Sequence, residues 1–202
     1  MSEIKYLGSV NFGDKVVMSD PCYDRDGGVV VKDILPGNYL CLVGREDRDR
    51  RNSFVIALHE NFYRPNMESH WDNPADILES FRLQGFSYKR AGDIGVDSGQ
   101  AGIYDYDEFI NHEKEREYNN PEHWYRQVCE TTEDGKARAG LINGKGVTSS
   151  SGWGDGCYDS YIIYLPNPLT HTVQRCAFLI DFGMFDEYDE EYEDNYDEEE
   201  EE

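Results

Sequence analysis

The stretch YDSYIIYLPNPLTHTVQRCAFLIDF, residues 158–182, contains the two longest β-strand signals of the 202-residue chain. Tyr158 to Leu165 and Thr172 to Phe182 are rich in Tyr, Ile, Val and Phe, which favour strands. Nine shorter segments of the same kind precede them, bounded by Gly, Pro, Asn or Asp. They are Ile4 to Val10, Lys15 to Ser19, Val29 to Lys32, Asn38 to Val43, Ser53 to Leu58, Gly92 to Val96, Gly102 to Tyr104, Arg138 to Ile142 and Gly146 to Ser149.

Three short helices are predicted between these strands. Asn73 and Asn120 each stand before a proline, a pairing of cap residue and first helical residue that is typical of a helix start. Asp105, with Glu108 three residues later, resembles a capping box. Strands outnumber helices and do not alternate with them, so we predict a β-rich α+β fold with a mainly antiparallel sheet or sandwich.

The charge of the chain is concentrated at its C-terminal end. The sequence has 42 acidic and 19 basic side chains, a net charge of −23. Residues 186–202 carry 13 of the acidic groups and no Lys or Arg, which leaves −10 for the rest. Mutual repulsion predicts that residues 186–202 form a disordered acidic tail behind a single domain of residues 1–185. The acidic excess also argues against direct binding to nucleic acid or to an anionic membrane.

The cysteines and the apolar pattern indicate a cytoplasmic protein. Five scattered cysteines without a C-x-x-C pair fit neither a disulfide framework nor a zinc ribbon. Cys41 and Cys176 lie in apolar strand-like runs and are expected to be buried thiols. No run of 18 apolar residues and no apolar N-terminal leader is present.

Three polar segments follow predicted strands, at residues 19–24, 96–102 and 149–158, and the second and third of them contain glycines. Loops that leave strand ends commonly carry binding groups. We expect the second and third loops to lie side by side around one concave site, with Trp153 as its apolar wall. The predicted ligand-binding residues are Asp97, Ser98, Gln100, Ser151, Trp153 and Asp155, and no cofactor is predicted.

The motifs DSGQAGIYD (97–105) and SSGWGDGCY (150–158), with Trp124, Tyr125 and Cys129 between them and LIDF (179–182) after them, carry a resemblance. Together they resemble an uncharacterised family of bacterial and phage proteins that is catalogued as a domain of unknown function. The resemblance covers residues 96–182 and implies a bacterial or phage origin and a role for the two glycine loops. It implies no activity, cofactor or catalytic residue.

The same loops are also compatible with a metal site or an anion site. Asp20, Asp97 and Asp155 are candidate ligands for a divalent cation, although the neighbouring segment 24–27 lacks the later ligands of a calcium loop. Gly152, Gly154 and Gly156 are candidates for an anion cradle, which needs basic side chains from elsewhere. The basic cluster is interleaved with acids, which favours a salt-bridged surface loop. Its arginines are Arg45, Arg48, Arg50 and Arg51.

These observations favour a non-enzymatic binding protein over an enzyme. Its expected role is to sequester a small ligand or to occupy a basic site on a host protein. The alternative is a metal-assisted hydrolase that uses Asp20, Asp97 and Asp155. A third interpretation is an accessory protein whose acidic tail recruits a partner.

Overall fold

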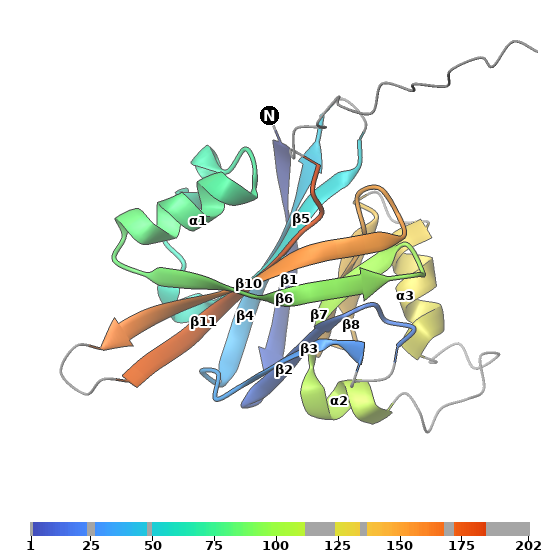
Figure 1. The fold of residues 1–202 in the computed structure, drawn as a ribbon, viewed down its shortest axis with the longest axis horizontal. Helices are drawn as coiled ribbons and strands as arrows, with labels where there is room; N and C mark the ends of the chain where they lie inside the picture. The colour runs from blue at the N-terminus through green and yellow to red at the C-terminus, as the bar shows by residue number, and fades with distance from the viewer. Residues whose placement is uncertain are drawn as a thin grey trace, which may run out of the picture.

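The computed structural model of the protein describes residues 2–23, 27–47, 50–111, 124–133, 137–167 and 172–184, and within them the chain forms two β-sheets (Figure 1). Neighbouring strands in both sheets are antiparallel. The larger sheet has the order β1 (Ser2–Phe12), β4 (Gly37–Glu46), β5 (Asn52–His59), β11 (Thr172–Asp181), β10 (Gly156–Asn167) and β6 (Ser87–Val96). The smaller has the order β3 (Val29–Lys32), β2 (Lys15–Ser19), β7 (Gln100–Asp105), β9 (Gly146–Ser150) and β8 (Ala139–Ile142).

The predicted helices are present, and the caps Asn73 and Asp105 explain where the first two begin. The Asn73 side chain accepts a hydrogen bond from Asp76 N at 2.9 Å, and Asp105 Oδ1 accepts from Asp107 N and Glu108 N. The β-rich α+β prediction is therefore confirmed, and the described part of the chain also contains the 3-10 helices η2 (Glu60–Phe62) and η3 (Met67–His70), which were not predicted. The predicted helices are α1 (Pro74–Leu83), α2 (Tyr106–Asn111) and α3 (Trp124–Glu133).

The sheets and helices make four layers. Side chains of both sheets, such as Met18 and Ile103 from one and Phe178 from the other, share a buried cluster. α1 lies on the outer side of the larger sheet, while α2 and α3 lie on the outer side of the smaller one (Figure 1). The strand β5 has an uninterrupted apolar run because all eight of its residues are buried. Its side chains alternate between the inter-sheet cluster and the cluster under α1, so no position faces water.

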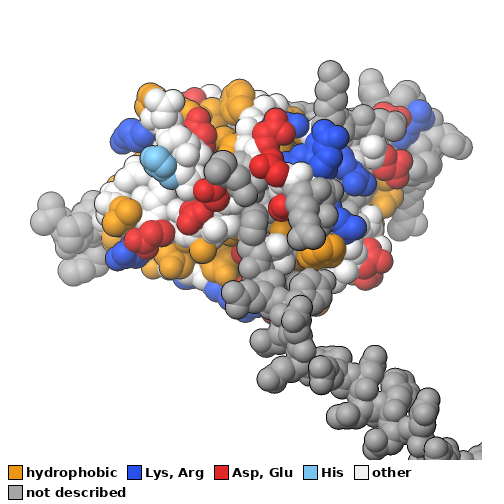
Figure 2. Space-filling model, turned by 90° about the horizontal axis from the view of Figure 1, so that it is seen from above, with side chains coloured by type: hydrophobic (Ala, Val, Ile, Leu, Met, Phe, Trp, Pro, Cys, Tyr) orange, Lys and Arg blue, Asp and Glu red, His pale blue; other side chains and the backbone are white. Residues whose placement is uncertain are grey.

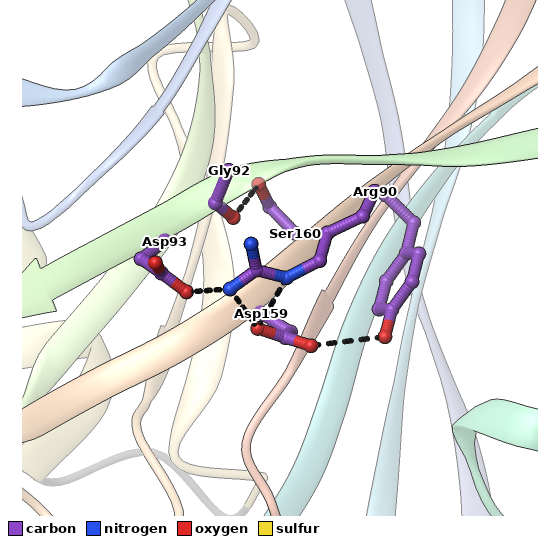
Figure 3. A network of polar contacts seen from close by, with 6 residues as sticks. Arg90, Gly92, Asp93, Asp159 and Ser160 are labelled. Carbon is purple, nitrogen blue, oxygen red and sulfur yellow. Dashed lines mark hydrogen bonds and ion pairs between the residues drawn. The ribbon is translucent and has the colours of Figure 1, made fainter.

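A surface ion-pair network joins β6 to β10 (Figure 3). Arg90 Nε donates to Asp159 Oδ1 at 2.8 Å, the same guanidinium pairs with Asp93, and Tyr161 OH donates to Asp159 Oδ2. The Arg90 hydrogen bond lowers the pKa of Asp159. Burial, followed by the neighbouring Asp159 carboxylate, raises the pKa of Tyr161 to about 12. This arginine therefore has its charge matched by carboxylates of the same sheet.

All five cysteines are free thiols, as their spacing predicted, and Cys41 and Cys176 are buried. Burial raises the pKa of Cys176 to about 12. The predicted acidic tail lies outside the described residues, as do Asn120 and Pro121. No helix in the described ranges is long and apolar enough to cross a membrane.

Candidate functional site

Asp20, directly after β2, fixes the turn between β6 and β7. The residue is fully buried. Its Oδ2 accepts from Asp97 N and Ser98 N, both at 2.8 Å, and its Oδ1 accepts from Cys22 N at 2.7 Å and from Ser98 Oγ at 2.8 Å. A carboxylate has about four lone-pair sites, so these four donors fill it. Asp20 is an anchor for the loop and has no site left for a ligand.

The two glycine loops lie side by side, as the sequence predicted. Gln100 pairs with Ser150 between β7 and β9, and Ser151 N donates to Gly99 O at 3.0 Å beyond the strand ends. Gly99 has a φ of 68°, a left-handed conformation that suits glycine. A cavity of about 500 Å³ opens where the loops meet. Four of the predicted ligand-binding residues, Ser98, Gln100, Ser151 and Trp153, line it.

Arg51 supplies a positive charge to this cavity. Its guanidinium lies 4.6 Å from the centre of the Trp153 ring, and Arg51 Nη1 donates to Gly152 O at 3.3 Å. Stacking on an aromatic face and bonding to a carbonyl hold the guanidinium without neutralising it. The arginine-rich segment is predicted to be a salt-bridged surface loop, whereas within the described residues the Arg51 side chain contacts Trp153 and Gly152. Trp153 is 44% exposed, so it forms an open wall and not a core anchor.

Arg138 brings a second guanidinium-bearing side chain to the lining. It is exposed, and its backbone has a positive φ of 49°. Its carbonyl oxygen accepts hydrogen bonds from Ser150 N at 2.8 Å and from Asn52 Nδ2 at 3.2 Å. Asn52 is on β5, so this contact ties the larger sheet to the edge of the smaller one beside the cavity.

A buried amide lies at the inner side of the cavity. Gln100 is only 5% exposed, and its Nε2 donates to Thr132 Oγ1 of α3 at 2.6 Å. Its Oε1 is buried without a hydrogen-bond partner. Since unpartnered buried polar atoms are rare, such an oxygen beside a cavity marks a place for a ligand or water. Thr132 and its neighbour Glu133, at the end of α3, complete this side of the lining.

Asp97 and Asp155 were predicted to face the cavity, but both side chains are exposed and lie outside its lining. The Asp97 backbone N–H donates to the Asp20 carboxylate. The Asp97 carboxylate accepts a hydrogen bond from Tyr23 and does not face the cavity. That hydrogen bond raises the pKa of Tyr23 to about 12. Asp155 follows Gly154, whose φ of 101° directs the chain away towards β10.

The glycine loop at residues 151–156 is closed by its own hydrogen bonds. Gly154 N donates to Ser151 O, and Ser151 Oγ donates to Gly154 O at 2.8 Å. Tyr158 OH also donates to Gly154 O at 2.8 Å. The Gly154 amide is therefore used within the turn, and the predicted cradle of successive glycine amides does not form at this position. The cavity's positive charge comes from arginines instead.

The structure gives no support for the metal centre of the alternative interpretation. Within the described part of the chain, no group of three or more His, Cys, Asp or Glu side chains is placed to hold a metal ion. Asp20, the central candidate, has its oxygens filled by the protein's own donors. Burial and the adjacent Asp20 carboxylate also raise the pKa of Cys22 to about 12, which opposes a nucleophilic role.

Four lining residues come from outside the two predicted glycine loops: Arg51, Thr132, Glu133 and Arg138. Arg51 had a signal, because it belongs to the only dense basic cluster of the chain. The others reach the cavity through the docking of α3 and β8 beside the glycine loops, which no local pattern reveals.

Comparison with known proteins does not assign this site. No model of a known protein family matches the chain, and no match is found among curated proteins or solved structures. The resemblance of the two glycine motifs to an uncharacterised family stays a prediction. A functional conclusion therefore depends on the geometry of the cavity.

Proposed function

We propose that the protein is a non-enzymatic binding protein that holds a small anionic ligand in the cavity between the β6–β7 and β9–β10 loops. The observation that carries the proposal is Arg51, which stacks on Trp153 beside Arg138. A guanidinium held by an aromatic ring presents a planar fork that matches a carboxylate or a phosphate. The volume of about 500 Å³ is in the range of small-molecule sites.

Local charge supports an anion despite the net charge of −23. On the face seen in Figure 2, Lys and Arg side chains gather between carboxylates, so the surface potential is mixed. Coulomb attraction is strongest for nearby groups and is screened within about 10 Å at ordinary salt. The arginines that line the cavity therefore act on a bound anion more strongly than distant carboxylates do.

The arrangement favours binding over catalysis. The hydroxyls of Ser98 and Ser151 donate to Asp20 and to Gly154 O, and neither contact pairs a nucleophile with an available base. Sequestration of a small ligand by a cytoplasmic protein of bacterial or phage origin is consistent with the resemblance of the glycine motifs. Cytoplasmic location and phage origin remain part of this proposal.

Isothermal titration calorimetry with methyl phosphate at low salt tests the proposal. The wild-type protein should bind this probe. Arg51→Gln should raise the dissociation constant at least about tenfold, which is the usual loss of affinity for a charge-assisted hydrogen bond. Arg82→Gln is the matched control, because Arg82 lies on α1 and pairs with Glu79. Equal affinities of wild type and Arg51→Gln, or no binding at all, would overturn the proposal.

A further inference from the structure

The serine hydroxyls at the cavity have their protons committed within the protein. Ser98 Oγ lies 2.8 Å from Asp20 Oδ1, and a carboxylate only accepts, so Ser98 is the donor. Ser151 Oγ is likewise the donor to Gly154 O. Each hydroxyl oxygen keeps lone pairs once its proton is used. These two groups therefore act towards a ligand as acceptors.

The orientation of the Gln100 amide follows from its neighbour. Thr132 Oγ1 lies 2.9 Å from Val128 O, a carbonyl that only accepts, so the Thr132 proton points along its own helix. Gln100 must then present its Nε2 to Thr132, at 2.6 Å. This leaves Oε1 as the unpartnered atom in a side chain that is 95% removed from solvent. Gln100 is among the residues that line the cavity, so a turn of its side chain would bring this acceptor to a ligand.

The lining of the cavity contains both charged donors and hydrogen-bond acceptors. Its charged donors are Arg51 and Arg138, whereas Gln100 Oε1, the serine oxygens and the Glu133 carboxylate are acceptors. A simple anion matches the arginines and leaves the Gln100 oxygen unpartnered, which is costly for a buried polar atom. A ligand that also carries donors satisfies both sets.

We infer that the ligand combines an anionic group with hydrogen-bond donors, either hydroxyls or an ammonium group, and that Gln100 selects for those donors. The anionic group binds at Arg51 and Arg138, and a donor of the same molecule reaches Gln100 Oε1. This inference rests on the proposed function, since it specifies the ligand of the same cavity. It goes further by requiring that anions without donors bind weakly.

Calorimetry of the wild-type chain with three phosphate monoesters tests whether a ligand needs hydrogen-bond donors besides its phosphate group. Methyl phosphate carries the anion alone, glucose 6-phosphate adds hydroxyls, and O-phosphoethanolamine adds an ammonium group. At least one donor-bearing ester should bind about fivefold or more tightly than methyl phosphate, the gain expected of one neutral hydrogen bond or more. The better ester identifies the kind of donor. If all three bind equally, the inference is wrong and the proposed function stands; if none binds, both fail.

Gln100→Met provides the second arm, because methionine keeps the length of the side chain and removes its amide, both Oε1 and the Nε2 that donates to Thr132. The advantage of the donor-bearing ester should disappear, while the affinity for methyl phosphate stays within about twofold of wild type. Gln84→Met, at the exposed end of α1, is the matched control and should keep the full advantage. Retention of the advantage in Gln100→Met would overturn the role of Gln100. Should this variant not fold, the comparison of the three esters on the wild type still decides the inference.

Discussion

Two polar centres lie next to each other at the glycine loops, and they differ in how far the protein satisfies them. The Asp20 carboxylate is fully buried and receives four donors from its own chain. The Gln100 amide is nearly as buried, but only its nitrogen has a partner. A saturated polar group stabilises the fold, whereas a half-satisfied one beside a cavity is suited to recognition.

Substitution of the saturated centre should have the largest effect. Asp20→Asn keeps the shape of the side chain but turns one acceptor oxygen into a donor that faces existing donors. Two hydrogen bonds to a charged group are lost, so the free energy of unfolding should fall by about 3 to 5 kcal/mol. Urea denaturation followed by circular dichroism measures this. Asp155→Asn, an exposed carboxylate of the other loop, should change stability by less than about 0.5 kcal/mol. Similar losses in the two variants would refute the assignment of Asp20 as an anchor.

The Asp20 centre should also suppress the reactivity of its neighbour Cys22. This thiol is exposed, yet burial of part of it and the Asp20 charge raise its pKa to about 12. A raised thiol pKa means less thiolate at pH 8, so alkylation by iodoacetamide should be at least about tenfold slower than for an unperturbed thiol. Peptide mapping by mass spectrometry gives the rate, and the same peptide in urea-unfolded protein is the reference. The rate should keep rising above pH 9 in the folded state; equal rates in the two states would contradict the prediction.

The sequence predicted features that depend on neighbouring residues, but not those that depend on tertiary contacts, such as the partners of Asp20 and Gln100. The strands and helix starts could be predicted because β-branched and aromatic runs, and caps such as Asn73, act over a few residues. The meeting of the glycine loops followed from their position after strands. The roles of the acidic residues did not follow, because whether Asp20 or Asp97 faces a cavity depends on which backbone amides reach it. Arg138 and Thr132 come from segments whose docking is set by tertiary packing alone.

Two arginines differ in the same way, because one is paired with carboxylates and the other is not held by an ion pair among the described residues. Arg90 is matched by Asp93 and Asp159, whereas Arg51 stacks on Trp153. Arg90→Gln should lower the free energy of unfolding only slightly, since the pair is solvent-exposed. Arg51→Gln should leave stability within about 0.5 kcal/mol of wild type and act on anion binding instead. A reversed pattern, with Arg90→Gln impairing methyl phosphate binding, would contradict this division.

The pH dependence of Arg90→Gln gives a second readout. Arg90 lowers the pKa of Asp159 in the folded protein, so the pair stabilises the fold above the unfolded pKa of about 3.8. That contribution is lost as the pH falls through the lower folded value. Wild type and Arg90→Gln should therefore differ most at neutral pH and converge in strong acid. Denaturation at several pH values, in low salt, measures the difference.

Removal of residues 186–202 should have the smallest effect on stability. The segment carries a charge of −13 and few groups that can be buried, so its deletion should change the free energy of unfolding by less than about 0.5 kcal/mol. Its effect on the cavity is electrostatic: loss of more than half of the net charge weakens the repulsion of an incoming anion. Methyl phosphate should bind the shortened chain about two- to threefold more tightly at low ionic strength, and the difference should vanish near 0.5 M salt because exposed charges are then screened. A fall of several degrees in the melting temperature would show that the tail packs on the domain. A large gain in affinity that persists at high salt would instead place the tail in direct competition for the arginines of the cavity.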